Sequence, residues 1–222
     1  MSAELFEVIN KKGGLIRLVY QNTFDSINLI KKVIGDLTTE YDKKYPPGSR
    51  AVRFISEDMG EFEERMQFAG DVLVFSMHTN IFEFSRYHEV MSTSYIKEDK
   101  ERSYCGIINI YNFLTDSFKY NRVNDVGYLI GRIFINKDKC YFIEGKREVG
   151  LLYNNFGQEV FDENAARKLV ESAVTYAINF DLLTPPFDAV KEISLEEVKS
   201  TAESHTLKTG KRLGFKFLAD KE

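Results

Sequence analysis

Residues 107–114, IINIYNFL, place bulky apolar side chains on both faces of a predicted β-strand. Side chains alternate between the two faces of a strand, which gives Ile107, Tyr111 and Phe113 on one face and Ile108, Ile110 and Leu114 on the other. Residues 128–135, YLIGRIFI, show the same two-sided pattern. A sheet with one face in water would alternate more cleanly between apolar and polar residues. We therefore expect both faces of this sheet to be covered, by helices, by sheet curvature, by a ligand or by another subunit.

Further strand-like runs lie on both sides of this stretch, separated by short turn signals. Gly70-Asp71 and residues 136–139 are typical of tight turns. Neighbouring strands joined this closely pair antiparallel, because a parallel return needs a long crossover. The predicted strands are residues 51–55, 62–68, 72–79, 81–87, 103–114, 118–123, 127–135, 140–143 and 149–153.

Two long helices are predicted from apolar residues that recur at steps of three and four. The first covers residues 23–45 and the second residues 163–183, where Leu169, Ala173 and Ile178 belong to the apolar stripe and are expected to be buried. The prediction is an α+β single domain with a six- to seven-stranded, mainly antiparallel sheet and the two long helices packed on one face. This order of elements resembles that of helix-grip folds, a likeness of architecture that implies no function.

The ends of the chain carry weaker patterns. Residues 1–20 suggest a short helix stopped at Gly13 and Gly14, followed by a strand-like run. Residues 195–205 predict a helix, with Ser194 and Glu197 placed as a capping box. The domain is expected to span residues 1–205, with 206–222 as a basic tail or edge strand that belongs to the same domain.

Two internal features complete the predicted fold. Residues 89–102 are polar and predict a surface loop, while Gly127 and Gly131 indicate close packing or a bulge.

Composition limits the class of protein. The formal net charge is −4, which makes a nucleic-acid partner unlikely for the chain as a whole. No run of 18 apolar residues predicts a membrane helix, and the first residues do not resemble a signal peptide. Cys105 and Cys140 are therefore expected to be reduced, buried thiols of a cytoplasmic protein. The abundance of Lys, Ile, Asn and Phe suggests a bacterial or phage origin.

The sequence motifs that usually carry chemistry are missing or incomplete. Residues 208–212, KTGKR, resemble half of a phosphate-binding loop, but the upstream glycine is absent and Arg212 replaces the magnesium-binding hydroxyl. The metal spacings H-E-x-x-H and C-x-x-C do not occur. We predict no catalytic residue, no metal and no cofactor, and an enzyme is the less favoured hypothesis.

The leading hypothesis is a non-catalytic protein-binding or assembly protein that contacts itself or a larger assembly through apolar sheet or tail surface. Alternating apolar residues of the tail are the candidate interface, namely Leu213, Phe215 and Phe217. One alternative is a small-molecule-binding domain with an aromatic-lined pocket, for which the candidate residues are His78, His88, Tyr111 and Tyr128. A second alternative is an enzyme of unrecognised type. The basic tail also carries a nucleic-acid hypothesis, against which its strand-like alternation argues.

Overall fold

A single antiparallel sheet organises the chain in the computed structural model, which describes residues 2–46, 48–145, 156–180, 184 and 186–204. The strand order is β1-β2-β3-β5-β6-β7, and β4 pairs with the beginning of β5. The strands are β1 (Phe54–Asp58), β2 (Glu63–Phe68), β3 (Asp71–Met77), β4 (Phe82–Glu83), β5 (Tyr104–Leu114), β6 (Tyr128–Asn136) and β7 (Tyr141–Gly145). The predicted α+β class and seven-stranded antiparallel sheet are confirmed.

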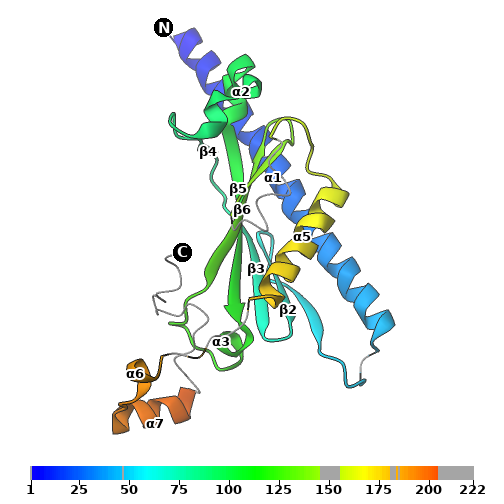
Figure 1. Ribbon diagram of the computed structural model, residues 1–222. Coiled ribbons are helices and arrows are strands. Elements are labelled where there is room, and N and C mark those ends of the chain that lie inside the picture. The colour runs from blue at the N-terminus through cyan, green and yellow to red at the C-terminus, as the bar shows by residue number, and fades with distance from the viewer. Residues whose placement is uncertain (1, 47, 146–155, 181–183, 185, 205–222) are drawn as a thin grey trace.

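Two long helices cover one face of this sheet, as predicted (Figure 1). They are α1 (Ser2–Lys44) and α5 (Glu163–Ile178). Their apolar stripes meet the sheet in one cluster that includes Ile27, Ile34, Phe75, Ile110 and Leu169. This helix side forms the main core of the domain, where burial of apolar surface supplies most of the stabilisation.

The first helix is much longer than the sequence predicted. Residues 2–22 continue it without a break, so the predicted stop at Gly13 and Gly14 and the strand-like run after them were wrong. Each glycine costs a helix about 1 kcal/mol. The packed part of α1 already nucleates the helix, and extending a formed helix is far easier than starting one.

A close approach fixes where α1 crosses the sheet. Gly106 of β5 lies directly beneath Thr23, and a Cβ added at Gly106 would come within 2.0 Å of the Thr23 hydroxyl oxygen. Thr23 is fully buried and its hydroxyl donates a hydrogen bond to the carbonyl of Val19 at 2.7 Å. Only glycine leaves room for this crossing.

Two segments between strands differ from the prediction. Residues 89–102 are not a simple surface loop, because η1 (Glu89–Ser92), α2 (Ser94–Glu98) and η2 (Lys100–Ser103) fold there over the sheet. We call residues 82–103 the cover segment. The predicted strand over residues 118–123 is instead α3 (Thr115–Lys119) followed by a turn.

Several smaller predictions are settled by the described residues. Gly131 lies at a β-bulge opposite Ile110, and the hairpin over residues 136–139 joins β6 to β7 as expected. Leu169 and Ala173 are buried, whereas Ile178 is exposed at the last turn of α5 and was wrongly predicted to be core. None of the described helices combines the length and apolar character needed to cross a bilayer.

The C-terminal part holds two short helices, α6 (Phe187–Val190) and α7 (Leu195–Ser204). The predicted capping box is confirmed, because the Ser194 hydroxyl accepts from the Glu197 amide at 3.0 Å and the Glu197 carboxylate accepts from the Ser194 amide at 2.9 Å. The predicted strand at 149–153, the tail at 206–222 and its residues Leu213, Phe215 and Phe217 lie outside the described residues.

Candidate functional site

The sheet face opposite α1 and α5, here called the far face, divides into a covered half and an open half. The cover segment packs over the covered half, which β6, β7 and the first residues of β5 form. The open half is a groove of about 830 Å³ whose floor is formed by β2, β3 and the end of β5. Its apolar floor consists of Val72 and Val74, which are buried, and of the half-buried Tyr111 and Phe113.

Strand pairing assembles this floor. Val72 lies opposite Phe113, and Val74 lies opposite Tyr111, in the register of β3 with β5. Directly opposed β-branched and aromatic residues stabilise an antiparallel pair. The floor is therefore a fixed surface that belongs to the most central strands of the sheet.

Helix α3 forms one wall of the groove. The ring of Phe118 packs edge-on against Phe113, with 5.5 Å between ring centroids, and 39% of Phe118 remains exposed. Gly127 leaves space for the Phe113 ring, because a Cβ there would approach the ring to 2.2 Å. The close packing predicted at Gly127 is thus confirmed, and its role is to seat an aromatic residue of the groove.

The turn after α3 is held by polar contacts. Asn121 adopts a left-handed backbone with φ of 49°, a conformation that asparagine tolerates better than most residues. The amide of Arg122 then donates to the carbonyl of Ser117 at 2.8 Å. The Ser117 hydroxyl donates to the Asp125 carboxylate at 2.6 Å, and the Arg122 guanidinium lies 3.7 Å from the same carboxylate. These contacts hold the wall in place beside the floor.

Four charged residues of the groove form two ion pairs with one another. The guanidinium of Arg65 lies 2.8 Å from the Glu63 carboxylate and also stacks over the Phe118 ring, 4.9 Å from its centroid. Together with the pair Arg122–Asp125, this gives the groove both signs of charge. A groove of this kind lacks the single-signed field that attracts nucleic acid or other polyanions.

The covered half of the far face is sealed by aromatic residues. Phe84 of the cover segment lies 4.8 Å from Phe134 and 6.2 Å from Phe142, measured between ring centroids. Val90 and Ile96, also from the cover segment, are buried in the same cluster. The two-sided apolar pattern of the strands is thus explained here within one chain.

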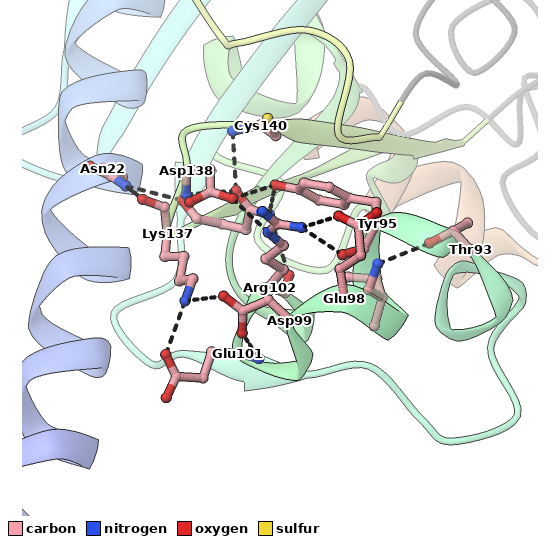
Figure 2. A network of polar contacts seen from close by, with 12 residues as sticks. Asn22, Thr93, Tyr95, Glu98, Asp99, Glu101, Arg102, Lys137, Asp138 and Cys140 are labelled. Carbon is pink, nitrogen blue, oxygen red and sulfur yellow. Dashed lines mark hydrogen bonds and ion pairs between the residues drawn. The ribbon is translucent and has the colours of Figure 1, made fainter.

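Figure 2 shows the polar network that ties the cover segment to the β6–β7 hairpin. Asn136 is fully buried, and its amide nitrogen donates to the Tyr95 hydroxyl at 2.9 Å. The Tyr95 hydroxyl donates to the Asp138 carboxylate at 2.8 Å, and Arg102 donates to the same oxygen at 3.0 Å. Burial raises the pKa of the Tyr95 hydroxyl above its ordinary value, so the hydroxyl stays a proton donor at neutral pH.

The network reaches α1 through Asn22. The amide of Asn22 donates to the backbone carbonyls of Asn136 at 3.0 Å and of Lys137 at 2.8 Å (Figure 2). Lys137 in turn pairs with Asp99 at 2.6 Å and with Glu101 at 2.9 Å. Fully satisfied networks of this kind rigidify a structure. The structural role of this network is to hold the cover segment on the sheet.

A second hollow, of about 720 Å³, lies at the outer edge of the cover segment. Its lining includes Tyr95, Glu98, Phe142 and Gln158. Phe142 and Tyr95 are already engaged in the aromatic cluster and the polar network. The hollow is therefore the margin of the covered half, and the groove remains the better candidate.

The four candidate ligand residues do not meet in one pocket. Tyr111 lines the groove, whereas Tyr128 packs against the core on the helix side. His78 is exposed after β3, where its Nδ1 accepts from the Asn80 amide at 3.0 Å. His88 caps η1, with its Nδ1 accepting from the Val90 amide at 3.3 Å. Both histidines thus have local structural contacts.

The described residues that line the groove include no histidine and no cysteine. Cys105 and Cys140 are free and buried beneath the cover segment, and burial raises the pKa of the Cys105 thiol, which disfavours the reactive thiolate. Within the described part of the chain, no group of three or more His, Cys, Asp or Glu side chains is arranged to hold a metal ion.

One carboxyl group with a raised pKa lies on the other side of the sheet. Glu64 is buried on β2, and burial raises its pKa to about 7, an effect that outweighs the nearby Lys31 ammonium. Glu64 faces the helix side, because it alternates with the groove residues Glu63 and Arg65. It therefore cannot act on a molecule held in the groove.

Sequence reasoning identified Tyr111 but missed Phe118, Arg65 and Arg122. Phe118 had been assigned to a strand, and only the contact of α3 with Phe113 places it at the groove. The polar–apolar alternation of Glu63, Arg65 and Gln67 was a usable signal that this end of the far face meets water.

Comparison with known proteins adds no further constraint on this site. No protein-family model matches the chain, and no curated protein or solved structure is significantly similar to it.

Proposed function

We propose that the chain is a non-catalytic protein-binding protein that takes an apolar segment of a partner into the groove on the open half of the far face. The observation that carries this proposal is the groove itself, with an apolar floor, a partly exposed aromatic wall at Phe118 and charges paired at its margin.

The composition of the groove resembles the centre of a protein interface. Aromatic residues and arginine are enriched at such interfaces, where a few of them carry most of the binding energy. Phe118, Tyr111 and Arg65 are residues of these types. Because Arg65 is already paired with Glu63, an apolar partner can bury the aromatic surface without leaving that charge unpaired.

The shape also favours a polypeptide partner. The floor of the groove spans three neighbouring strands, β2, β3 and the end of β5, and α3 forms a wall beside it. An extended segment can place alternate side chains on such a floor. A small molecule would be favoured by an enclosed cavity that buries most of its surface.

A peptide-display selection tests this proposal with a matched pair of variants. Phe118→Asp places a charge in the groove, and Phe82→Asp makes the same change on β4, at a phenylalanine of nearly equal exposure, 39% against 38%. Peptides selected on the native protein should carry bulky apolar residues. They should lose about tenfold or more in affinity for the Phe118→Asp variant and keep their affinity for Phe82→Asp.

Two results would reject the proposal. Selected peptides that bind both variants equally well would show that the groove is not the binding surface. Failure to select peptides, together with a co-purifying small molecule that native mass spectrometry detects and Phe118→Asp releases, would support the ligand-binding alternative instead.

A further inference from the structure

A row of polar side chains crosses the far face between its covered half and the groove. Strand pairing places one residue of each strand directly opposite the next, from β2 to β7. The row consists of Glu63, Ser76, Asn109, Arg132 and Glu144. Directly opposed side chains of an antiparallel pair lie about 5 Å apart, so the row is continuous across these strands.

The polar row separates two apolar surfaces. On one side, Ile107 lies opposite Phe134 and Phe134 lies opposite Phe142, among the aromatic residues beneath the cover segment. On the other side, Val74 and Tyr111 begin the floor of the groove. The polar row therefore forms one side of the groove, and α3 forms the other.

The two central members of the row carry hydrogen-bonding groups that the fold does not use. The charged members are held in the ion pairs Arg65–Glu63 and Arg132–Glu144. Ser76 and Asn109 are half-buried, and within the described part of the chain neither side chain takes part in a hydrogen bond. A hydroxyl and an amide at the edge of the groove can thus both donate to and accept from a bound molecule.

The dimensions of the floor limit the direction in which a segment can lie. Along the strands, the apolar floor on β3 consists of Val72 and Val74, about 7 Å apart. Across the strands, it extends over β2, β3 and β5, and it continues to Leu129 of β6, which lies opposite Tyr111 and is 41% exposed. The spacings from β2 to β6 add up to about 14 Å, the length of about four residues of extended chain. A segment therefore has most room across the strands, between α3 and the polar row.

An extended segment in this position meets the polar row with its backbone. Its N–H and C=O groups are not paired within the segment, and each needs a partner when it is buried. Ser76 and Asn109 supply donors and acceptors for them, as a strand edge does in strand addition. A helix has already paired its backbone groups, so it would remove water from Ser76 and Asn109 and give them no partner in return.

We propose that the groove binds an extended segment that crosses the strands, and that Asn109 and Ser76 hold its backbone while its apolar side chains contact Tyr111 and Phe113. This inference rests on the proposed function, and it adds the conformation of the partner segment and the residues that position it. The partner class is a loop or other non-helical segment with bulky apolar side chains, as opposed to an amphipathic helix.

The probe for this inference is a peptide selected on the native protein in the display experiment. Asn109→Leu removes the amide but keeps the size of the side chain, and it should lower the affinity about fivefold. Ser76→Ala should lower it about threefold, and it carries the test if the first variant does not fold. The control is Asn10→Leu, the same exchange at an exposed position of α1, which should leave the affinity unchanged.

Copies of the peptide with an N-methyl group on each backbone amide in turn identify the amide that Asn109 holds. N-methylation of that amide should cost about tenfold in affinity for the native protein, but at most about twofold for Asn109→Leu, because the partner is already missing. A general loosening of the sheet in the variant would not depend on one particular amide of the peptide.

Three results would overturn the inference. Peptides that need Phe118 but bind Asn109→Leu and Ser76→Ala as tightly as the native protein would overturn it and leave the proposed function standing. A peptide that NMR shows to be helical when bound would do the same. Peptides that bind independently of Phe118 would reject the proposed function and this inference together.

Discussion

The two halves of the far face share strands but differ in what covers them. Strand β5 (Tyr104–Leu114) crosses both: Cys105 lies beneath the cover segment, whereas Tyr111 and Phe113 form part of the groove floor. In the covered half Phe134 and Phe142 are buried by residues 82–103. In the open half Phe118 stands at the margin and stays partly exposed.

This difference shows that an apolar strand face can be covered without a third layer of long helices. The chain between β3 and β5 supplies Phe84, Val90 and Ile96 to this half of the face, and Phe156, which follows β7, joins them in the same cluster. Where that segment ends, the apolar floor continues into the groove. The apolar surface that remains exposed there includes Phe118, and it is the surface that we propose for binding.

The largest effect is expected at the centre of the covered half. Phe142→Ala should destabilise the domain by about 3–5 kcal/mol, because it removes a buried aromatic ring from the packed cluster. That ring contacts Phe84, Phe134 and Phe156. Urea denaturation measures the change. A loss below about 1 kcal/mol would mean that the cover segment does not seal the sheet.

The polar network around Asn136 should contribute slightly less to the stability of the domain than the aromatic cluster around Phe142. Asn136→Ala should cost about 2–4 kcal/mol, because it leaves the backbone amides of Asp138 and Cys140, the second of which is buried, without their acceptor. Hydrogen exchange in residues 94–103 should rise at the same time, as the cover segment loosens.

Lys139→Ala in the same hairpin is the control for Asn136→Ala. It removes an exposed ion pair with Asp25, 3.1 Å apart, and should change stability by at most about 1 kcal/mol. Equal losses in the two variants would argue against a special role for the buried amide.

Glu64 lies on the helix side of β2, whose other side lines the groove. Its raised pKa makes the stability of the domain depend on pH. The folded chain holds this proton to about pH 7, and the unfolded chain releases it near the ordinary value of 4.5. The folded state thus binds more protons between these values, so stability falls as pH rises through this window.

Glu64→Gln removes the titrating carboxyl group and with it the loss of stability as pH rises. The variant should be more stable than the native chain by about 1–3 kcal/mol at pH 8, and the difference should close below pH 4. Urea midpoints measured across this range check it. A native chain that is more stable than Glu64→Gln at pH 8 would show that the carboxylate is favourably paired when charged.

The smallest effect on stability is expected in the open half. Phe118→Ala should change the free energy of unfolding by about 1 kcal/mol or less, because a partly exposed ring gains little from folding. Measured beside Phe142→Ala, it gives a direct contrast between the two halves. A loss as large as that of Phe142→Ala would show that Phe118 belongs to the core.

Much of the fold could be predicted because it depends on local periodicity. The two-sided apolar pattern of residues 107–114 and the turn at residues 136–139 identified the central sheet, and the spacing of Ile27, Ile30 and Ile34 identified the packed part of α1. The capping box at Ser194 was identified for the same reason, since its hydrogen bonds join residues three apart.

Other features depend on contacts between distant residues. Residues 89–102 were predicted as a surface loop, because their polar residues Tyr95 and Arg102 are satisfied by Asn136 and Asp138, far away in sequence. The groove depends on the register of β3 with β5 and on α3 folding back to Phe113. Composition carries no information about either arrangement. The helix stop predicted at Gly13 and Gly14 was wrong for a related reason. The low helix propensity of glycine is a small effect compared with the ease of extending a helix that has already formed.

Carbene footprinting, which labels accessible side chains, compares the two halves in one experiment. In the free protein, Phe118 should be labelled, while Phe134 and Phe142 should be protected. Addition of a peptide selected on the native protein should suppress labelling of Phe118 and leave Phe134 and Phe142 unchanged. Equal protection of the three residues before the peptide is added, or no suppression at Phe118 after it binds, would contradict an open groove that serves as the binding surface.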